Sequence, residues 1–132
     1  MANLTTGRDT RSKDIVRSIS IPVKAATVIQ DGSIVCVIGG YAAPAVDGAG
    51  NIVMGIADWK VDNSAGANGD KSIRVRQGVF HLDNANCVAA DVGKTVYPSD
   101  DHTANHTAGA NTVALGQFLE LDPDGGAWVR VP

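Results

Sequence analysis

Aromatic residues, cysteines and long apolar runs are all scarce in this chain of 132 residues. Aromatic residues make up 5% of it, although hydrophobic residues together reach 44% and glycines number 15. A core with so few aromatic rings must be built mainly from Val, Ile, Leu and Ala, and this composition with many glycines favours short strands joined by tight turns. A chain of this length can bury such a core without help from a metal or disulfides.

A segment able to cross a membrane or direct export is also missing. The longest apolar run, Ile34 to Ile38, is much shorter than the roughly 20 apolar residues that a membrane-spanning helix needs. The N-terminal region has charged residues but no apolar stretch after them, so we expect no secretory signal. We therefore expect no membrane partner.

Cysteines are too few and too far apart to form a metal or redox motif. Cys36 and Cys87 are the only two, and neither lies in a C-x-x-C pair or beside a histidine. Both are next to small or β-branched apolar residues. We therefore expect two buried free thiols, with a disulfide as the less favoured alternative.

Positive charge is not in excess. The formal net charge is −3, whereas a general nucleic-acid-binding protein is expected to be basic, so we predict no direct contact with nucleic acid. The charge is unevenly divided, because basic side chains outnumber Asp9 and Asp14 in residues 1–24. The basic residues of this segment are Arg8, Arg11, Lys13, Arg17 and Lys24.

One cluster has the composition of a metal site. Asp100, Asp101, His102 and His106 place two carboxylates and two imidazoles close together in the chain, and these groups bind first-row metal ions. The histidine spacing would align both rings on a helix, but the threonine, asparagine and glycine residues of this stretch disfavour a helix. A solvated polar loop is the favoured interpretation, and we expect no metal or other cofactor.

Signatures of an enzyme are missing as well. Gly66–Ser72 is rich in glycine and ends in Lys-Ser, but Asp70 interrupts the phosphate-loop pattern and a predicted strand follows it instead of a helix. No G-x-S-x-G or Cys/His signature accompanies the histidines. We predict a protein that is not an enzyme; a small enzyme would need a pocket that gathers His81, His102 or His106 with a carboxylate.

What the sequence does contain is a series of short strand patterns, of which Lys71–Leu82 is the clearest. Its large apolar residues alternate with polar ones but change parity at Gly78. One extra residue near this glycine, a β-bulge, would return all of them to one core face. These apolar residues are Ile73, Val75, Phe80 and Leu82.

Arg74 and Arg76 lie between the apolar residues of this strand and are predicted to point away from the core. Solvation of an ordinary outer face accounts for such charges in most proteins. The alternative is a cationic stripe that contacts a partner.

Residues 1–24 are predicted to form a flexible or extended N-terminal arm. Met1 to Arg17 is polar and charged, without an apolar period before Ile15. Residues 18–23 alternate polar and apolar side chains, but Pro22 cannot donate to a β-ladder, so this stretch is predicted as an edge strand or an extended arm lying on a surface. An edge strand of this kind can also add to the sheet of a neighbouring subunit.

Residues 25–132 are predicted to form a single β domain. Turn signals recur about every 8 to 12 residues and divide it into about seven or eight short strands, as in a β-sandwich or small barrel. Residues 83–91 form at most one helical turn, and residues 99–111 read as a polar loop. The predicted fold class is therefore all-β, a small β-barrel or β-sandwich with an N-terminal arm.

Two hairpins are predicted within this domain. Asp31-Gly32 separates residues 27–30 from residues 33–38, and Asp-Gly between apolar runs favours a tight hairpin turn. The sequence D-P-D-G-G predicts a second hairpin between residues 112–121 and residues 128–131.

Several motifs in residues 26–131, taken in their order, resemble a known family. The most distinctive is V-D-N-S-A-G-A-N-G-D, which leads into the strand ending G-V-F at Phe80. The other motifs are A-T-V-I-Q-D-G-S-I-V (Ala26–Val35), G-Y-A-A-P-A (Gly40–Ala45), V-M-G-I-A-D (Val53–Asp58), D-V-G-K-T-V-Y (Asp91–Tyr97) and W-V-R-V (Trp128–Val131). Together they resemble the head decoration, or capsid cement, proteins of tailed bacteriophages.

The resemblance implies a small β-barrel or β-sandwich protein bound in many copies to the outside of an icosahedral shell, often as trimers, where it stabilises the expanded head. Its partners would be the major capsid protein and further copies of itself. It would be assembled in the host cytoplasm and located on the outer capsid surface of the virion. The candidate capsid or subunit contacts are Arg8, Arg11, Arg17, Ile19, Ile21, Arg74 and Arg76.

Two alternatives stay open. The arm of residues 1–24 could be a tail without a role in binding. The protein could also be a virion-surface β module that binds a carbohydrate or receptor, which would need Trp59 or Trp128 exposed beside polar loops. Single aromatic residues near strand ends are more often core or rim residues.

Overall fold

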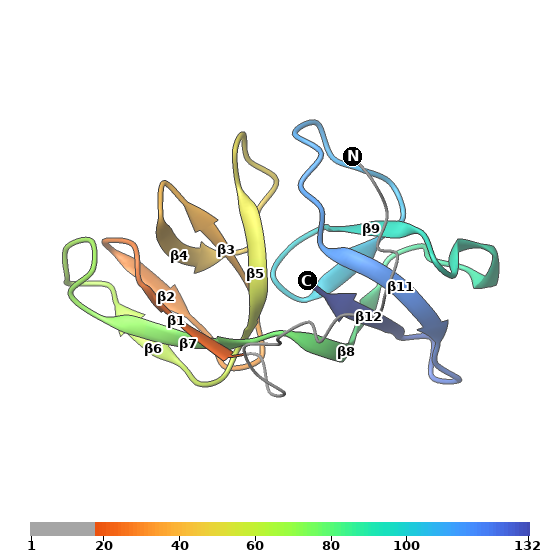
Figure 1. Cartoon of the computed structure of the whole chain (residues 1–132), viewed down its shortest axis with the longest axis horizontal. Helices are drawn as coiled ribbons and strands as arrows, with labels where there is room; N and C mark the ends of the chain where they lie inside the picture. The colour runs from red at the N-terminus through yellow and green to blue at the C-terminus, as the bar shows by residue number, and fades with distance from the viewer. Residues whose placement is uncertain (1–17) are drawn as a thin grey trace, which may run out of the picture.

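The structure, a computed structural model, describes residues 18–132 and confirms the all-β fold (Figure 1). This part of the chain contains twelve strands and one short 3₁₀ turn. The strands form two barrel-like halves that lie side by side along the longest axis of the molecule (Figure 1). The strand count exceeds the predicted seven or eight because three very short strands were missed and one predicted strand is split in two.

The first half contains seven strands, which are β1 (Ser18–Pro22), β2 (Thr27–Ile29), β3 (Ile34–Ile38), β4 (Tyr41–Pro44), β5 (Ile52–Ala57), β6 (Val61–Asn63) and β7 (Ser72–Arg76). Five of them form an antiparallel sheet in the order β1-β7-β5-β3-β4, and β2 pairs with β6 separately. The sheet rolls up so that the chain just after β1 meets β4 at a parallel bridge between Val23 and Ala42. The predicted edge strand is therefore present as β1, and its residues belong to the sheet although the arm was expected to extend to residue 24.

The second half is a closed barrel with the strand order β10-β8-β12-β11-β9. Its elements are β8 (Gly78–Asn84), the 3₁₀ turn η1 (Ala89–Asp91), β9 (Thr95–Pro98), β10 (Thr103–Asn105), β11 (Gly116–Leu121) and β12 (Ala127–Val131). Strands β8 and β10 are parallel, whereas the other pairs are antiparallel. The pairing of β11 with β12 confirms the hairpin predicted around D-P-D-G-G.

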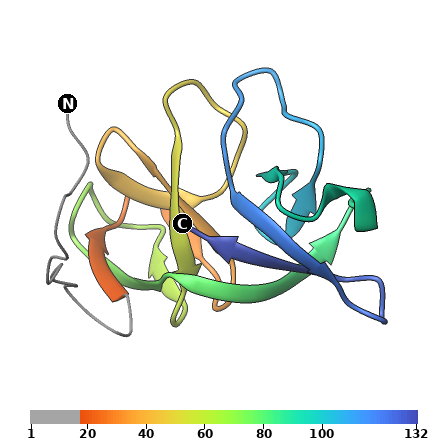
Figure 2. The same cartoon turned by 45° about the vertical axis from the view of Figure 1, so that its right-hand side comes forward.

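Strands β7 and β8 follow each other directly and carry the chain from one half to the other, as Figures 1 and 2 show from two directions. Ile73 and Val75 pack in the cluster inside the first half, whereas Phe80 and Leu82 pack in the cluster of the second half. The prediction that a bulge returns all four to one core face is wrong. The parity changes because the strand moves from one sheet to another.

A bulge lies instead in β5, the strand next to β7. Val35 pairs with Gly55 and Cys36 pairs with Val53, so Met54 is the extra residue. The side-chain amide of Gln77, the residue between β7 and β8, donates a 3.0 Å hydrogen bond to the carbonyl oxygen of Met54. This hydrogen bond thus links the bulge in β5 to the point where the chain passes from β7 to β8.

The hairpin predicted at Asp31-Gly32 is also wrong. Strand β2 pairs with β6, while β3 pairs with β4 and β5. The turn closes through the amide of Ser33, which donates to the carbonyl of Gln30 at 3.3 Å, and it is anchored to β5 because the amide of Gly32 donates to the carbonyl of Ala57 at 3.1 Å. The Asp-Gly signal therefore marks a turn between two different sheets.

Asn63 organises the loop of the distinctive V-D-N-S-A-G-A-N-G-D motif. Its side chain is buried, and its Nδ2 donates to the carbonyl oxygens of Val23 at 3.4 Å, Lys24 at 3.0 Å and Ala67 at 3.1 Å. A Cβ on Gly66 would collide with the Oδ1 of Asn63. This loop is therefore fastened to the chain that follows β1.

The two halves share an apolar cluster. The interior of the second barrel continues into side chains from β3, β5 and the β4–β5 loop, namely Ile34, Ala45, Val53 and Ile56. The other cluster fills the first half alone. Cys36 and Cys87 are buried free thiols, as predicted, and burial raises the pKa of each.

Candidate interaction surface

The outer face of β1 and β7 carries two arginines, Arg74 and Arg76. Ser18 pairs with Arg76 and Ser20 pairs with Arg74, so the four side chains share one face of the sheet. Both arginines are exposed, as predicted from the alternation. Within residues 18–132, β1 pairs only with β7 along its length and lies at an edge of the sheet.

Arg76 is held at the junction of the two halves. Its Nε lies 2.9 Å from the Oδ1 of Asp58, and its guanidinium carbon lies 5.4 Å from the centre of the Phe80 ring. Arg74 has no ion pair with another residue of the described part of the chain. Arg74 is therefore the freer of the two cations.

The two isoleucines proposed as contacts differ in burial. Ile19 is 37% exposed, whereas Ile21 is 7% exposed and packs in the cluster of the first half. Ile19 therefore has side-chain surface exposed to solvent, and Ile21 supports the strand from within. Arg8, Arg11 and Arg17 lie outside the described residues.

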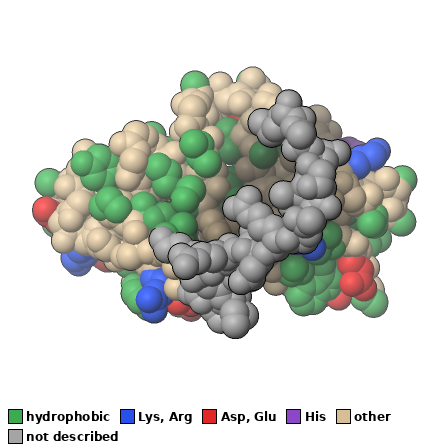
Figure 3. All heavy atoms as spheres, viewed as in Figure 1, with side chains coloured by type: hydrophobic (Ala, Val, Ile, Leu, Met, Phe, Trp, Pro, Cys, Tyr) green, Lys and Arg blue, Asp and Glu red, His purple; other side chains and the backbone are tan. Residues whose placement is uncertain are grey.

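Large apolar side chains are exposed on both halves. Figure 3 shows hydrophobic side chains scattered over the viewed face, with most of the charged side chains near its rim. The exposed large apolar residues are Ile19, Val46, Ile52, Trp59, Val79, Val88, Val92 and Leu121. Val88 and Val92 differ from the others because they flank η1, a turn that a network of hydrogen bonds holds in place.

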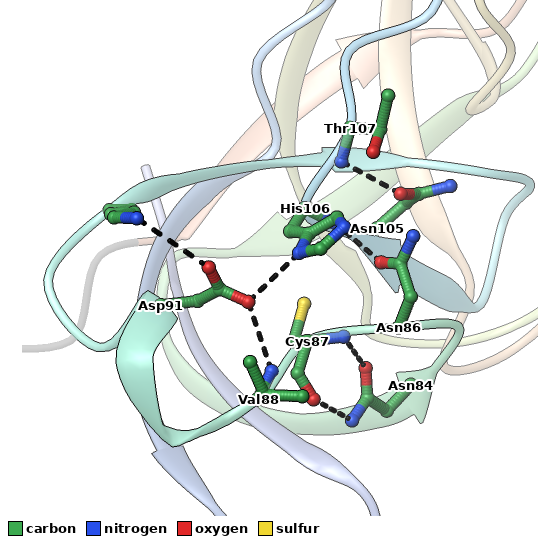
Figure 4. Close-up of polar contacts among 9 residues, drawn as sticks. Asn84, Asn86, Cys87, Val88, Asp91, Asn105, His106 and Thr107 are labelled. Carbon is green, nitrogen blue, oxygen red and sulfur yellow. Dashed lines mark hydrogen bonds and ion pairs between the residues drawn. The ribbon is translucent and has the colours of Figure 1, made fainter.

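Asp91 is the centre of that network (Figure 4). Its Oδ2 accepts a hydrogen bond from the amide of Val88 at 2.9 Å and lies 2.9 Å from the Nδ1 of His106. The Nζ of Lys94 lies 3.8 Å from its Oδ1. The amide of Val88, together with His106 and Lys94, lowers the pKa of the Asp91 carboxyl.

Asparagine side chains fix the chain before the turn (Figure 4). Asn84 accepts a 2.7 Å hydrogen bond from the amide of Cys87 and donates one of 2.9 Å to the carbonyl of the same residue. The Oδ1 of Asn86 accepts from the amide of His106 at 2.9 Å. The loop after β8 and the loop after β10 are thus held against each other.

The Asp/His cluster considered as a metal site is only partly assembled. The Nδ1 of His102 lies 2.9 Å from Asp101 and 3.1 Å from Asp100, but His106 turns away to Asp91. The hydrogen bond to Asp101 and the charge of Asp100 raise the pKa of His102. The structure therefore brings Asp100, Asp101 and His102 together but leaves His106 out of the predicted ligand set.

A second cluster, which the sequence did not indicate, surrounds His81. Its Nε2 lies 3.1 Å from Asp124 and 3.9 Å from Asp122, and the hydrogen bond to Asp124 raises its pKa. The Trp128 ring stands edge-on to the imidazole at 5.4 Å and donates its Nε1 hydrogen to Asp122. The ring and the indole N–H of Trp128 therefore both contact other residues of the protein, whereas Trp59 is 48% exposed.

Charge divides between the halves. Residues 18–77 have five basic and five acidic side chains, whereas residues 78–132 have only Lys94 and Arg130 against seven acidic side chains. The second half is therefore the acidic part of the described chain. No helix among the described residues is long and apolar enough to cross a membrane.

Comparison with known protein families shows which family this chain belongs to. The family of phage cement proteins matches residues 14–132. The chain belongs to the phage cement protein family. No curated protein and no solved structure matches it.

Membership of the phage cement family assigns this protein a structural role in the phage capsid. The family is a structural one, not an enzyme family. The match covers β1 and every later element of the described chain. It also begins at residue 14, so it includes the last residues before β1.

Proposed function

We propose that this phage cement protein binds the outer surface of the head, contacts the major capsid protein there, and stabilises the expanded shell. The observation that carries this proposal is the family match over residues 14–132. The exposed side chains of Ile19, Val88 and Val92 and the edge position of β1 within residues 18–132 support it, because such features suit a protein that bridges neighbours. Many modest contacts on one shell add up through multivalency.

The proposal includes self-association on the shell, as a trimer, and contact with protein rather than nucleic acid. The acidic second half disfavours binding to a phosphate backbone. Arg74 and Ile19 are the described contact candidates, and Arg8, Arg11 and Arg17 are the candidates in the arm. The protein would join the shell during assembly in the host cytoplasm.

The test is co-sedimentation of the purified chain with expanded heads that lack it. Saturable binding, together with a higher temperature at which the heads rupture, is the expected result. Failure of the full chain to bind such heads would overturn the proposal. Analytical ultracentrifugation of the free protein measures its oligomeric state.

A truncated chain tests the arm separately. The cut belongs just before Ser18, because a chain starting at Ala25 would lose β1 and the buried side chains of Ile21 and Val23. Weaker binding by the chain from Ser18 supports a role for the arm. If the chain from Ser18 binds as well as the full chain and an Arg74→Ala variant binds more weakly, the contact lies on the sheet instead.

A further inference from the structure

The turn around η1 displays apolar side chains and hides its single charged one. Val88, Ala89, Ala90 and Val92 are all exposed, whereas Asp91 between them is buried. A surface turn normally shows its charged side chain to water and buries its valines. Here the arrangement is reversed.

The reversal is held by specific contacts and not by chance packing. Asp91 is turned inward by the amide of Val88 and by the imidazole of His106, each at 2.9 Å. Asn84 fixes the chain just before the turn, and Asn86 binds the amide of His106. The backbone that carries both valines is therefore held in one conformation. Less conformational entropy is then lost when a partner binds.

The position of the turn restricts its partner. The turn extends from the side of the second barrel in both views (Figures 1 and 2). That barrel is acidic, but within Val88–Val92 the only charge is the inward carboxylate of Asp91. An uncharged, apolar and convex surface fits an apolar groove.

The size of the turn argues against a second copy as the sole occupant. A stable protein pair typically buries about 20 to 30 residues on each side, and this turn supplies five, Val88–Val92. A group this small works as an anchor inside a larger contact, where a few buried apolar residues carry much of the binding. A capsid shell offers such a contact in many copies.

We propose that Val88–Val92 is an apolar anchor that inserts into an apolar groove on the shell subunit, with Asp91 and His106 as its positioning residues. This inference rests on the proposed function, because it requires a shell that the protein binds. It adds the site of contact, which lies on the second half and away from the cationic face of β1 and β7.

The first experiment measures binding of the full chain to expanded, undecorated heads, with a double variant Val88→Ser and Val92→Ser. The matched control is Val46→Ser, because Val46 is 51% exposed and Val88 and Val92 are each 53% exposed. Loss of two partly exposed valines from an interface is expected to weaken binding about tenfold or more. The control is expected to bind like the unchanged chain.

The outcomes separate this inference from the proposed function. If the unchanged chain does not bind, the proposed function itself fails. If it binds and the double variant binds equally well, the anchor is disproved. Equal weakening by Val46→Ser, or a changed oligomeric state of the free double variant, would also overturn the inference, because the valines would then act non-specifically or between copies.

A second variant tests the positioning residues. His106→Ala removes the contact to Asp91 but leaves both valines in place, so it is expected to weaken binding to heads while circular dichroism still reports a folded barrel. Adding Val88→Ser to His106→Ala is expected to cause a smaller further loss than Val88→Ser alone, because both changes act on the same anchor. Fully additive losses, or unchanged binding by His106→Ala, would exclude the positioning role.

Discussion

Three polar residues are buried among the described residues, and each fixes a turn. Ser33 donates its hydroxyl to the carbonyl of Gln30, Asn63 donates to three carbonyls, and Asp91 accepts from the amide of Val88. A buried polar group is costly unless it is hydrogen-bonded, so each of these side chains favours one local conformation. In a chain with few aromatic residues, such contacts define loops that apolar packing does not.

His81 and Asp124 predict a pH dependence of stability at the residue scale. The pKa of His81 is raised, first by its hydrogen bond to Asp124, so the pair stabilises the fold below the unfolded pKa of histidine, about 6.5, and this gain is lost as the pH rises through the raised value. The pKa of Asp124 is lowered, by the amide of Gly126 and by His81, so the gain is also lost in strong acid. The gain is modest because both side chains are partly exposed.

We therefore expect the melting temperature of the unchanged protein to exceed that of His81→Gln at about pH 5.5, and the two to converge at about pH 8.5. Thermal melts followed by circular dichroism at both pH values provide the measurement. Asp124→Asn removes the same charge pair. In that background, the melting temperatures of the chains with His81 and with His81→Gln should differ much less. A difference that persists in the Asp124→Asn background would show that this pair is not its source.

At the scale of the elements, local patterns predicted strands better than they predicted strand partners. The alternation in residues 18–23, the apolar run of β3 and the final turn all gave elements that the structure contains. Strands β4, β6 and β10 were missed because three or four residues are too few to establish a period. The partners of β2 and β3 depend on contacts distant in the sequence, which no local turn signal contains.

Gly116 tests the close approach of β11 and β12. A Cβ there would collide with the carbonyl oxygen of Arg130 and come within 3.3 Å of the Cα of Val131, so both obstacles are backbone atoms. Gly116→Ala is expected to force the two strands apart and to lower the free energy of unfolding by about 1–3 kcal/mol. Urea denaturation measures this change as a shift of the midpoint at constant slope.

Gly48→Ala is the matched control for this prediction. A Cβ on Gly48 meets only the side chain of Asn51, with its Nδ2 at 2.6 Å, and that amide can rotate away at the cost of its 3.1 Å hydrogen bond to the carbonyl of Val46. Its midpoint should shift much less than that of Gly116→Ala. Equal shifts in the two variants would mean that the close approach of β11 to β12 is not what makes Gly116→Ala destabilising.

At the scale of the whole molecule, the sequence predicted the fold class and part of the candidate surface. The outward direction of Arg74 and Arg76 follows from strand alternation alone. The exposed turn at Val88 and Val92 does not, because the direction of Asp91 depends on His106, fifteen residues further along the chain. A pattern within a single element contains no information on such a contact.

The shared cluster predicts that both halves unfold together, as one domain. Ile34, Val53 and Ile56 belong to the first half but pack with the interior of the second barrel. Opening either half would therefore expose apolar surface of the other, which couples their free energies. We propose that residues 18–132 form a single cooperative unit.

The two tryptophans provide a separate reporter for each half, because Trp59 follows β5 and Trp128 lies in β12. In Trp128→Phe the fluorescence of Trp59 should unfold at the same urea concentration as the circular dichroism signal, and in Trp59→Phe the fluorescence of Trp128 should do the same. Ile34→Ala, made in each of these backgrounds, removes a fully buried side chain and should cost about 2–5 kcal/mol. Because Ile34 packs between the halves, this cost should lower both fluorescence midpoints equally, whereas a shift seen by only one tryptophan would mean that the halves unfold as separate domains.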